Sequence, residues 1–404
     1  MALETNKPSF GVLDDVKVVY AAVELAAPKA CDLMADWGAD VTWLENTGAG
    51  DTIRDTPYIK QAERRNQRSV SMNYFSDEGK EILFKMLADA DVFIEASKGG
   101  TWARKGITDE VLWEINPKLV IVHLSGFGQS GDPKMVKRAA YDLTVMAYSG
   151  YMSQNGTQEQ PMNPGPYAGD YFNSLMIVSS TLAALHKTNR TGKGESIDLA
   201  MYETLLAIGQ YYLVDYLNEG ILWPRPGARN QNLCGIGEYK CNDGFLGVCL
   251  YGVDQNKYFL ETIGLGHLWG TEDIPEDTSG LWLANPHAAE IEAAFEAYCL
   301  EHSKYEIEAD FAAHRIAAQV VMEFEDLVKE EHLKLREDFM DWETEDGKTF
   351  KGLGVFPKFQ QTPGQVWRPM PKQGGDTADV LTKLGYTADQ IAALNESGVV
   401  KVAE

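Results

Sequence analysis

The first half of the sequence alternates between short apolar runs and longer amphipathic segments, and this order limits the folds open to the chain. Continuous apolar runs are typical of strands that are covered on both faces of a sheet. The runs that we predict to be strands are residues 16–23, 41–45, 92–96 and 119–124. Helices are expected at residues 28–37 and 77–90. This alternation predicts a doubly wound, Rossmann-like α/β domain with a mostly parallel sheet.

The rest of the sequence predicts a second, smaller domain that interrupts the first. Two long apolar helices, at 171–187 and 201–217, are followed by a break rich in Pro, Gly and Asn at 223–237. A hairpin is expected around Asn242-Asp243-Gly244, then a mainly helical, acidic stretch at 254–338. We therefore predict a large domain at residues 1–221, an inserted α+β domain at 222–330, and a return to the large domain at 331–404.

Composition restricts the partners and the compartment. A length of 404 residues exceeds one hydrophobic core, and 44% apolar with 24% charged residues is typical of globular chains. The net charge of −24 argues against nucleic acid or an anionic membrane as partner. The five cysteines form no CxxC pair and the histidines have no metal spacing, so we expect no metal site. Without a secretory signal pattern or a long apolar stretch, we expect a cytoplasmic protein.

The segment Gly165-Pro166-Tyr167-Ala168-Gly169-Asp170-Tyr171-Phe172 places an acidic residue between a loop and an apolar helix. We predict that Asp170 caps this helix, where backbone N–H groups and the helix dipole favour the ionised carboxylate. Two interpretations remain open at this point. Asp170 is either a structural cap or an accessible nucleophile.

A second candidate segment, residues 95–106, follows the predicted strand at 92–96 and is rich in small and basic residues. Doubly wound folds bind ligands beyond the carboxyl ends of their strands. Lys98, Arg104 and Lys105 could therefore meet phosphate groups, or the segment is an ordinary solvated loop. The sequence contains no GxxxxGK[ST], which excludes a nucleoside triphosphate loop.

Two further features have a structural and a functional interpretation. The segment Cys234-Gly235-Ile236-Gly237 is either an interdomain turn or a loop that covers a site and offers backbone N–H groups. A set of aromatic residues could cage a quaternary ammonium group, or simply belong to the core. Its members are Tyr167, Tyr171, Phe172, Tyr211, Tyr212, Tyr216 and Trp223.

Several segments together resemble the family III CoA-transferases, over nearly the whole length of the chain. The segments that carry the resemblance are 64–66 (RRN), 91–99 (DVFIEASKG), 106–113 (GITDEVLW), 116–121 (NPKLVI), 124–129 (LSGFGQ), 185–187 (LHK), 191–198 (TGKGESID) and 239–241 (YKC). Any one of them alone would be weak, whereas the combination is specific. Within the family, the likeness is strongest to the bacterial carnitine CoA-transferases.

The resemblance implies a transferase that uses a coenzyme A thioester as co-substrate and has no permanently bound cofactor. Asp170 falls on the family's nucleophile. The residues that fall on its CoA-binding positions are Lys98, Arg104, Lys105, Gly235 and Gly237. An arginine is usual where this chain has Lys105, and lysine lacks its bidentate geometry. Relatives that use formyl-CoA have more glycines than this chain in the loop at 234–237.

The resemblance also implies substrates, an assembly and two alternatives. Carnitine would be the acceptor, crotonobetainyl-CoA or γ-butyrobetainyl-CoA the donor, and two interlocked subunits would form a homodimer. One alternative is a family III transferase for another small carboxylic acid, and the other is an acyl-CoA racemase or isomerase. The related racemases have a catalytic histidine near Ala140, and alanine cannot exchange a proton. A non-catalytic CoA-binding subunit is a third possibility.

Overall fold

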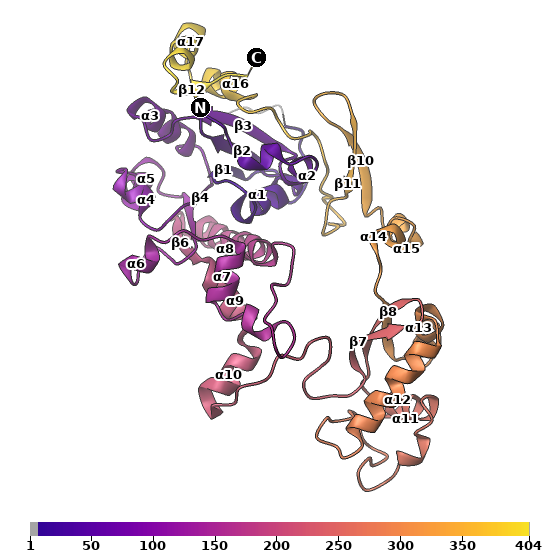
Figure 1. Cartoon of the computed structure of the whole chain (residues 1–404). Coiled ribbons are helices and arrows are strands. Elements are labelled where there is room, and N and C mark those ends of the chain that lie inside the picture. Colours follow the sequence, from indigo (N-terminus) through magenta and orange to yellow (C-terminus); the bar gives the residue numbers. More distant parts are fainter. Residues whose placement is uncertain (1–6, 404) are drawn as a thin grey trace. The chain divides into compact units, whose positions relative to one another are not determined.

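The computed structural model describes residues 7–403, which form two compact units (Figure 1). The first unit comprises residues 7–149, 165–208 and 332–403. The second comprises Gly150–Pro164 and Gly209–Glu331. Since compactness does not establish independent folding, the domain limits at residues 221 and 330 stay a prediction.

A seven-stranded sheet forms the centre of the first unit, in the order β12-β3-β2-β1-β4-β5-β6. Its strands are β1 (Lys17–Ala21), β2 (Asp40–Glu45), β3 (Gln67–Met72), β4 (Val92–Ala96), β5 (Val120–Ser125), β6 (Glu195–Ala200) and β12 (Val400–Lys401). All neighbours are parallel except β12, which pairs antiparallel with β3. The predicted mostly parallel α/β sheet is therefore confirmed. The strand order reverses between β1 and β4, which is where such sheets bind ligands.

The first unit also contains helices, several of which contact its strands. They are α1 (Ala26–Asp36), η1 (Thr52–Asp55), α2 (Ile59–Glu63), α3 (Asp77–Leu87), α4 (Thr101–Arg104), α5 (Asp109–Ile115), α6 (Pro133–Val136), α7 (Asp142–Tyr148), α8 (Ala168–Thr191), α9 (Met201–Ile208), α16 (Thr377–Lys383) and α17 (Ala388–Glu396). One core cluster joins Val19 and Phe93 of the sheet to Leu83 of α3 and Leu381 of α16. Helix α1 packs against α8. Residues 332–403 add the hairpin of β10 (Phe339–Glu343) and β11 (Thr349–Leu353).

Strand β3 was missed by the sequence analysis because its buried residues are mostly polar. Every residue of β3 is buried, yet only Val70 and Met72 are apolar. Arg68 pairs with Asp40 at 3.1 Å, and the hydroxyl of Ser69 donates to Glu45. These partners satisfy groups that would otherwise make burial costly. A search for apolar runs cannot detect a strand of this kind.

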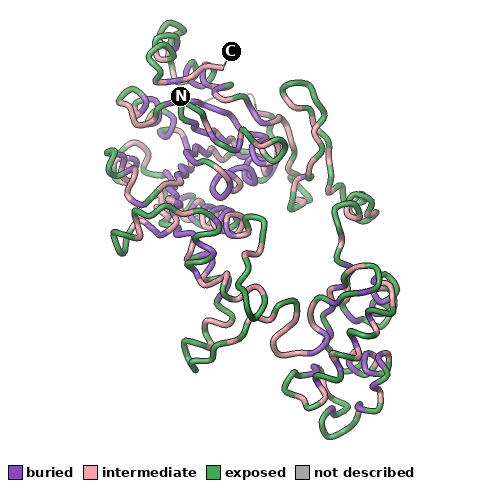
Figure 2. The backbone as a smooth tube through the Cα atoms, viewed as in Figure 1, coloured by how far each residue is buried: buried purple, intermediate pink, exposed green. Residues whose placement is uncertain are grey.

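The second unit contains a three-stranded antiparallel sheet, β7-β8-β9, with its own apolar core. The predicted hairpin is confirmed as β7 (Ile236–Cys241) and β8 (Gly244–Cys249). The stretch predicted to be helical contains α11 (Val253–Thr262), η3 (Gly266–Leu268), α12 (Ala288–Glu301), α13 (Lys304–Ala313), the strand β9 (Ala317–Val320), α14 (Phe324–Leu327) and α15 (Glu331–Leu335). Helix α10 (Gln210–Glu219) and η2 (Met152–Gln154) also belong to this unit, whereas α15 lies in the first unit except for Glu331. Figure 2 shows buried backbone within each unit.

Residues 7–403 contain no helix that is long and apolar enough to cross a membrane. All five cysteines are free thiols, and four of them are buried. Within the same described range, no group of three or more His, Cys, Asp or Glu side chains could hold a metal ion.

Candidate active site

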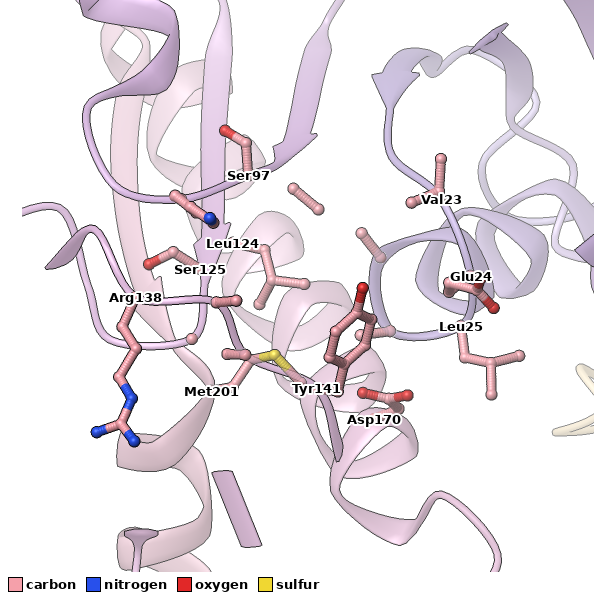
Figure 3. A pocket seen from close by; sticks show the side chains of 17 residues that line it. Val23, Glu24, Leu25, Ser97, Leu124, Ser125, Arg138, Tyr141, Asp170 and Met201 are labelled. Carbon is pink, nitrogen blue, oxygen red and sulfur yellow. The ribbon is translucent and has the colours of Figure 1, made fainter. Parts of the chain in front are cut away.

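A pocket of about 250 Å³ opens at the carboxyl ends of β1, β4 and β5, next to the reversal of strand order (Figure 3). Four short segments and two single residues line it: Val23–Ala27, Ala96–Lys98, Leu124–Gly126, Arg138–Tyr141, Asp170 and Met201. All of them belong to the first unit. The parallel sheet thus brings segments that are far apart in sequence to one site, as expected for this strand order.

Asp170 lies in the first turn of α8, but it does not cap the helix. The helix begins at Ala168, and the residue before it is Tyr167, whose φ is 52° and which makes no side-chain capping bond. The predicted cap position was therefore wrong by three residues. The Asp170 side chain instead faces the pocket (Figure 3), and its carboxylate accepts no hydrogen bond from any of residues 7–403.

The electrostatic environment of Asp170 opposes ionisation. Burial, followed by the charges of Asp142 and Glu24, raises the pKa of Asp170 from 3.8 to about 7. The sequence predicts that capping bonds and the helix dipole stabilise the ionised form, but desolvation and two neighbouring carboxylates outweigh the dipole. The carboxyl group is therefore only about half ionised near neutral pH.

Asp142, at the start of α7, fixes the first turn of α8. Its carboxylate accepts a hydrogen bond of 3.1 Å from the backbone N–H of Asp170. Gly169 permits this approach, since a Cβ atom there would lie 2.9 Å from Asp142 Oδ1. Asp142 is not among the residues selected from the sequence. Its spacing from Asp170 gave no signal that the two would be in contact.

Of the three basic residues predicted to bind CoA, only Lys98 lines the pocket. Arg104 and Lys105 lie on or just after the short helix α4 and are exposed. The Arg104 guanidinium donates to the carbonyl of Gly99 at 3.1 Å, and Lys105 Nζ lies 5.5 Å from the Phe75 ring centre. A basic residue that the analysis did not select, Arg138, lines the pocket as well.

Gly235 and Gly237 belong to the second unit. The N–H of Gly235 donates to Glu292 Oε1 at 2.8 Å, and Gly237 pairs with Val248 within the β7–β8 ladder. A Cβ at Gly235 would lie 2.8 Å from Leu250, so a side chain does not fit there. Their role toward CoA stays a prediction.

The aromatic residues selected as a possible cage are not those that line the pocket. Tyr171 points to Glu63, with its hydroxyl 3.3 Å from Glu63 Oε1, and Tyr167 is exposed. Tyr211, Tyr212, Tyr216 and Trp223 belong to the second unit. The aromatic ring that does line the pocket is Tyr141, which the sequence analysis did not include.

A buried hydrogen-bond network supports the loop that carries Lys98. His123 of β5 contacts Glu95 at 2.8 Å and Asp109 at 2.9 Å through its two ring nitrogens. The Ser97 hydroxyl, which lines the pocket, donates to the other oxygen of Glu95. Burial alone would lower the pKa of His123, but the bonds to Asp109 and Glu95 raise it to about 9.

Comparison with known proteins identifies the family. The model of CoA-transferase family III matches residues 13–377, which is most of the chain and includes every residue that lines the pocket. The chain belongs to CoA-transferase family III. It is therefore a transferase, and members of this family act on CoA thioesters without a permanently bound cofactor.

Solved structures are consistent with the assignment of this transferase to CoA-transferase family III. A CAIB/BAIF family protein from Brucella suis is 26% identical, with a TM-score of 0.78, and the match covers 93% of this chain and 100% of that one. Rv3272 from Mycobacterium tuberculosis is 21% identical, with a TM-score of 0.78 over 92% of this chain and 100% of its own. An aspartate-to-alanine mutant of Rv3272 matches with a TM-score of 0.79 at 21% identity, over 93% and 99% of the two chains. The two matches at 21% identity support the fold alone.

Proposed function

We propose that this transferase moves CoA from crotonobetainyl-CoA or γ-butyrobetainyl-CoA to L-carnitine, with the Asp170 carboxylate as covalent nucleophile. The observation that carries the proposal is that the Asp170 carboxylate faces the pocket and is unpaired among the described residues. It is a pocket-lining carboxylate without a hydrogen-bond donor or cation among residues 7–403. A carboxylate that is poorly solvated and unpaired is a stronger nucleophile than one held by donors.

The reaction proceeds by alternate attack on thioester and anhydride carbons. An Asp170 carboxylate oxygen attacks the donor thioester carbonyl, the C–S bond breaks, and CoA leaves as thiolate. The thiolate then attacks the aspartyl carbonyl of the mixed anhydride, which releases the donor acid and forms an aspartyl-CoA thioester. The acceptor carboxylate repeats these two steps in reverse order, which yields its CoA ester and restores Asp170.

The size and charge of the pocket suit the acyl and thioester part of the substrate inside it and the phosphates of CoA near its basic residues. About 250 Å³ is too small for a whole CoA molecule but large enough for a short acyl chain and the thioester. Lys98 and Arg138 give the site positive charge, which suits the phosphates of CoA. The backbone N–H groups of Gly235 and Gly237 are proposed as oxyanion donors once the substrate binds. In the present conformation the Gly235 N–H is engaged by Glu292.

The pocket has no proton-transfer group at position 140, where a racemase would need one. Ala140 lines the pocket where that alternative needs a histidine. Alanine cannot take or return an α-proton, so the pocket favours acyl transfer over racemisation.

The test is covalent trapping at Asp170. Wild-type protein is incubated with each betainyl-CoA donor, quenched with hydroxylamine, and the α8 peptide is analysed by mass spectrometry. We expect a hydroxamate at Asp170, and a loss of carnitine-dependent turnover of at least about 1000-fold in Asp170→Asn. Asp15→Asn, an exposed aspartate of the same unit, is the matched control. Near-normal turnover in Asp170→Asn would refute the mechanism.

We also propose that the transferase acts as a homodimer in the cytoplasm. A closed assembly would exclude water from an anhydride that hydrolyses readily. Light scattering of the purified protein should give about twice the mass of one 44.8 kDa chain, and a monomeric mass would contradict this proposal.

A further inference from the structure

Glu24, in the loop after β1, has a backbone conformation that is costly for a glutamate. Its φ is 64°, in the left-handed region that few residues other than glycine adopt. Strained residues of this kind persist where the surrounding structure holds them, and they concentrate at functional sites. Glu24 lines the pocket together with Asp170.

A buried ion pair holds both backbone groups of Glu24. Its N–H donates to the two carboxylate oxygens of Asp51, at 3.1 and 3.2 Å, and its carbonyl oxygen accepts from the guanidinium of Arg64. Arg64 and Asp51 are 2.8 Å apart and both side chains are fully buried. Arg64 also stacks over the Trp43 ring at 4.8 Å. A buried ion pair of this kind adds little stability compared with an apolar core, which indicates a role in fixing the loop.

The carboxylate of Glu24 is oriented but not neutralised. Thr52, the first residue of η1, donates its hydroxyl to Glu24 Oε1. No other hydrogen bond or ion pair reaches this carboxylate from residues 7–403. The loop therefore presents an acidic side chain to the pocket while one oxygen stays available for a ligand.

The charges that line the pocket are separated. Figure 3 shows Glu24 and Asp170 on one side of the pocket and Arg138 on the other. Because the phosphates of CoA are anionic, they are attracted to the side with Arg138. The acid portion of the substrate then lies beside Glu24 and Asp170, where a second negative charge is repelled and a positive charge is attracted.

From this arrangement we infer that Glu24 determines specificity, by pairing its carboxylate with a cationic group on the acid portion of the substrate. The inference rests on the proposed function, because it requires the acid to lie next to Asp170. It assigns to a single side chain the selection of acids that carry a quaternary ammonium group. Tyr141, on the same pocket, adds an aromatic surface to such a cation.

The experiment compares carnitine with its uncharged tert-butyl isostere, in which carbon replaces the ammonium nitrogen. In the wild type we expect kcat/KM to favour carnitine by about 100-fold, as for an ion pair shielded from water. Glu24→Gln keeps the size of the side chain and can still accept the Thr52 hydroxyl. It should lower kcat/KM for carnitine by about 30-fold or more and change the value for the isostere by less than about 3-fold.

Two further variants separate this inference from a general loss of structure. Glu78→Gln, an exposed charge change on α3, should leave both substrates unaffected. Thr52→Val keeps the Arg64–Asp51 ion pair and should reduce the preference for carnitine by a smaller factor than Glu24→Gln does. This variant provides a readout if Glu24→Gln does not fold. Equal losses for both substrates in Glu24→Gln, or in Thr52→Val if only that variant folds, would overturn the role of Glu24 in specificity.

The proposed function is tested separately in the same samples. If Asp170 is trapped by a donor but wild-type protein uses the isostere as well as carnitine, only the inference about Glu24 fails. If no acyl-CoA modifies Asp170, the proposed function fails and the inference fails with it.

Discussion

The raised pKa of Asp170 predicts that Asp170→Asn stabilises the first unit at alkaline pH. In the folded protein the pKa is about 7, whereas the reference value is 3.8, so the folded state binds more protons than the unfolded state between these values. Stability contributed by this group is therefore lost as the pH rises from about 4 through 7. Asparagine has a similar shape to the protonated carboxyl group and does not titrate.

The magnitude follows from the size of the shift. A difference of about 3 units corresponds to about 4 kcal/mol at about 1.4 kcal/mol per unit, which is an upper limit. Asp170 is partly exposed at the pocket, and solvent screening lowers this figure, so we expect a gain of about 2 to 3 kcal/mol. At about pH 5 the gain should be smaller, about 1 kcal/mol, because pH 5 lies only a little above the unfolded-state pKa of 3.8 and the penalty has only begun to accumulate.

Hydrogen exchange measures this effect locally. A chain with two compact units need not unfold in one step, so the protection of α8 amides is a better readout than a single melting temperature. Wild type and Asp170→Asn are compared at about pH 5 and about pH 8.5, with Asp15→Asn as control. An equal gain at both pH values, or a larger gain at the acidic one, would refute the reasoning.

Three other predictions concern the same region. The kcat/KM of the wild type should rise with pH through about 7, since the nucleophile must lose its proton, and a flat profile between about pH 5.5 and 8.5 would contradict this. His123→Gln should lower the free energy of unfolding by on the order of 2 kcal/mol at about pH 6 and by less at about pH 10. The reason is that the stability supplied by protonated His123 is present below pH 6.5 and is lost as the pH rises through about 9. Urea unfolding at both pH values measures this difference. Gly126→Ala places a Cβ atom 2.0 Å from the Ala140 Cβ, so it should cost about 1 to 3 kcal/mol and lower activity, as judged by thermal shift and turnover.

The parts of the fold that the sequence predicted are those with an apolar signal. Strands β1, β2, β4 and β5 were recognised from continuous apolar runs, and the hairpin of β7 and β8 from its Asn-Asp-Gly turn. Strand β3 was not, because its burial depends on partners such as Asp40 and Glu45. Ion pairs between distant residues leave no periodic pattern in a sequence.

The candidate site was predictable to a similar degree. Asp170 and Lys98 were selected from their neighbours and from the family resemblance, and both line the pocket. Glu24 was missed because neither its left-handed backbone nor the Arg64–Asp51 pair that holds it can be inferred from local spacing. The pKa of Asp170 was misjudged for the same reason, since Asp142 approaches it only in three dimensions.

The pairing of β12 with β3 has a consequence for how the protein is made. Val400 pairs with Met72, and the Thr377 hydroxyl accepts from the N–H of Ser71, a residue 306 positions earlier. During translation the edge of β3 stays unpaired until the segments that contain Thr377 and Val400 have left the ribosome. A bare strand edge recruits other strands, so the nascent chain is exposed to aggregation for most of its synthesis. Shielding of this edge by chaperones during that interval is therefore expected to raise the yield of active transferase.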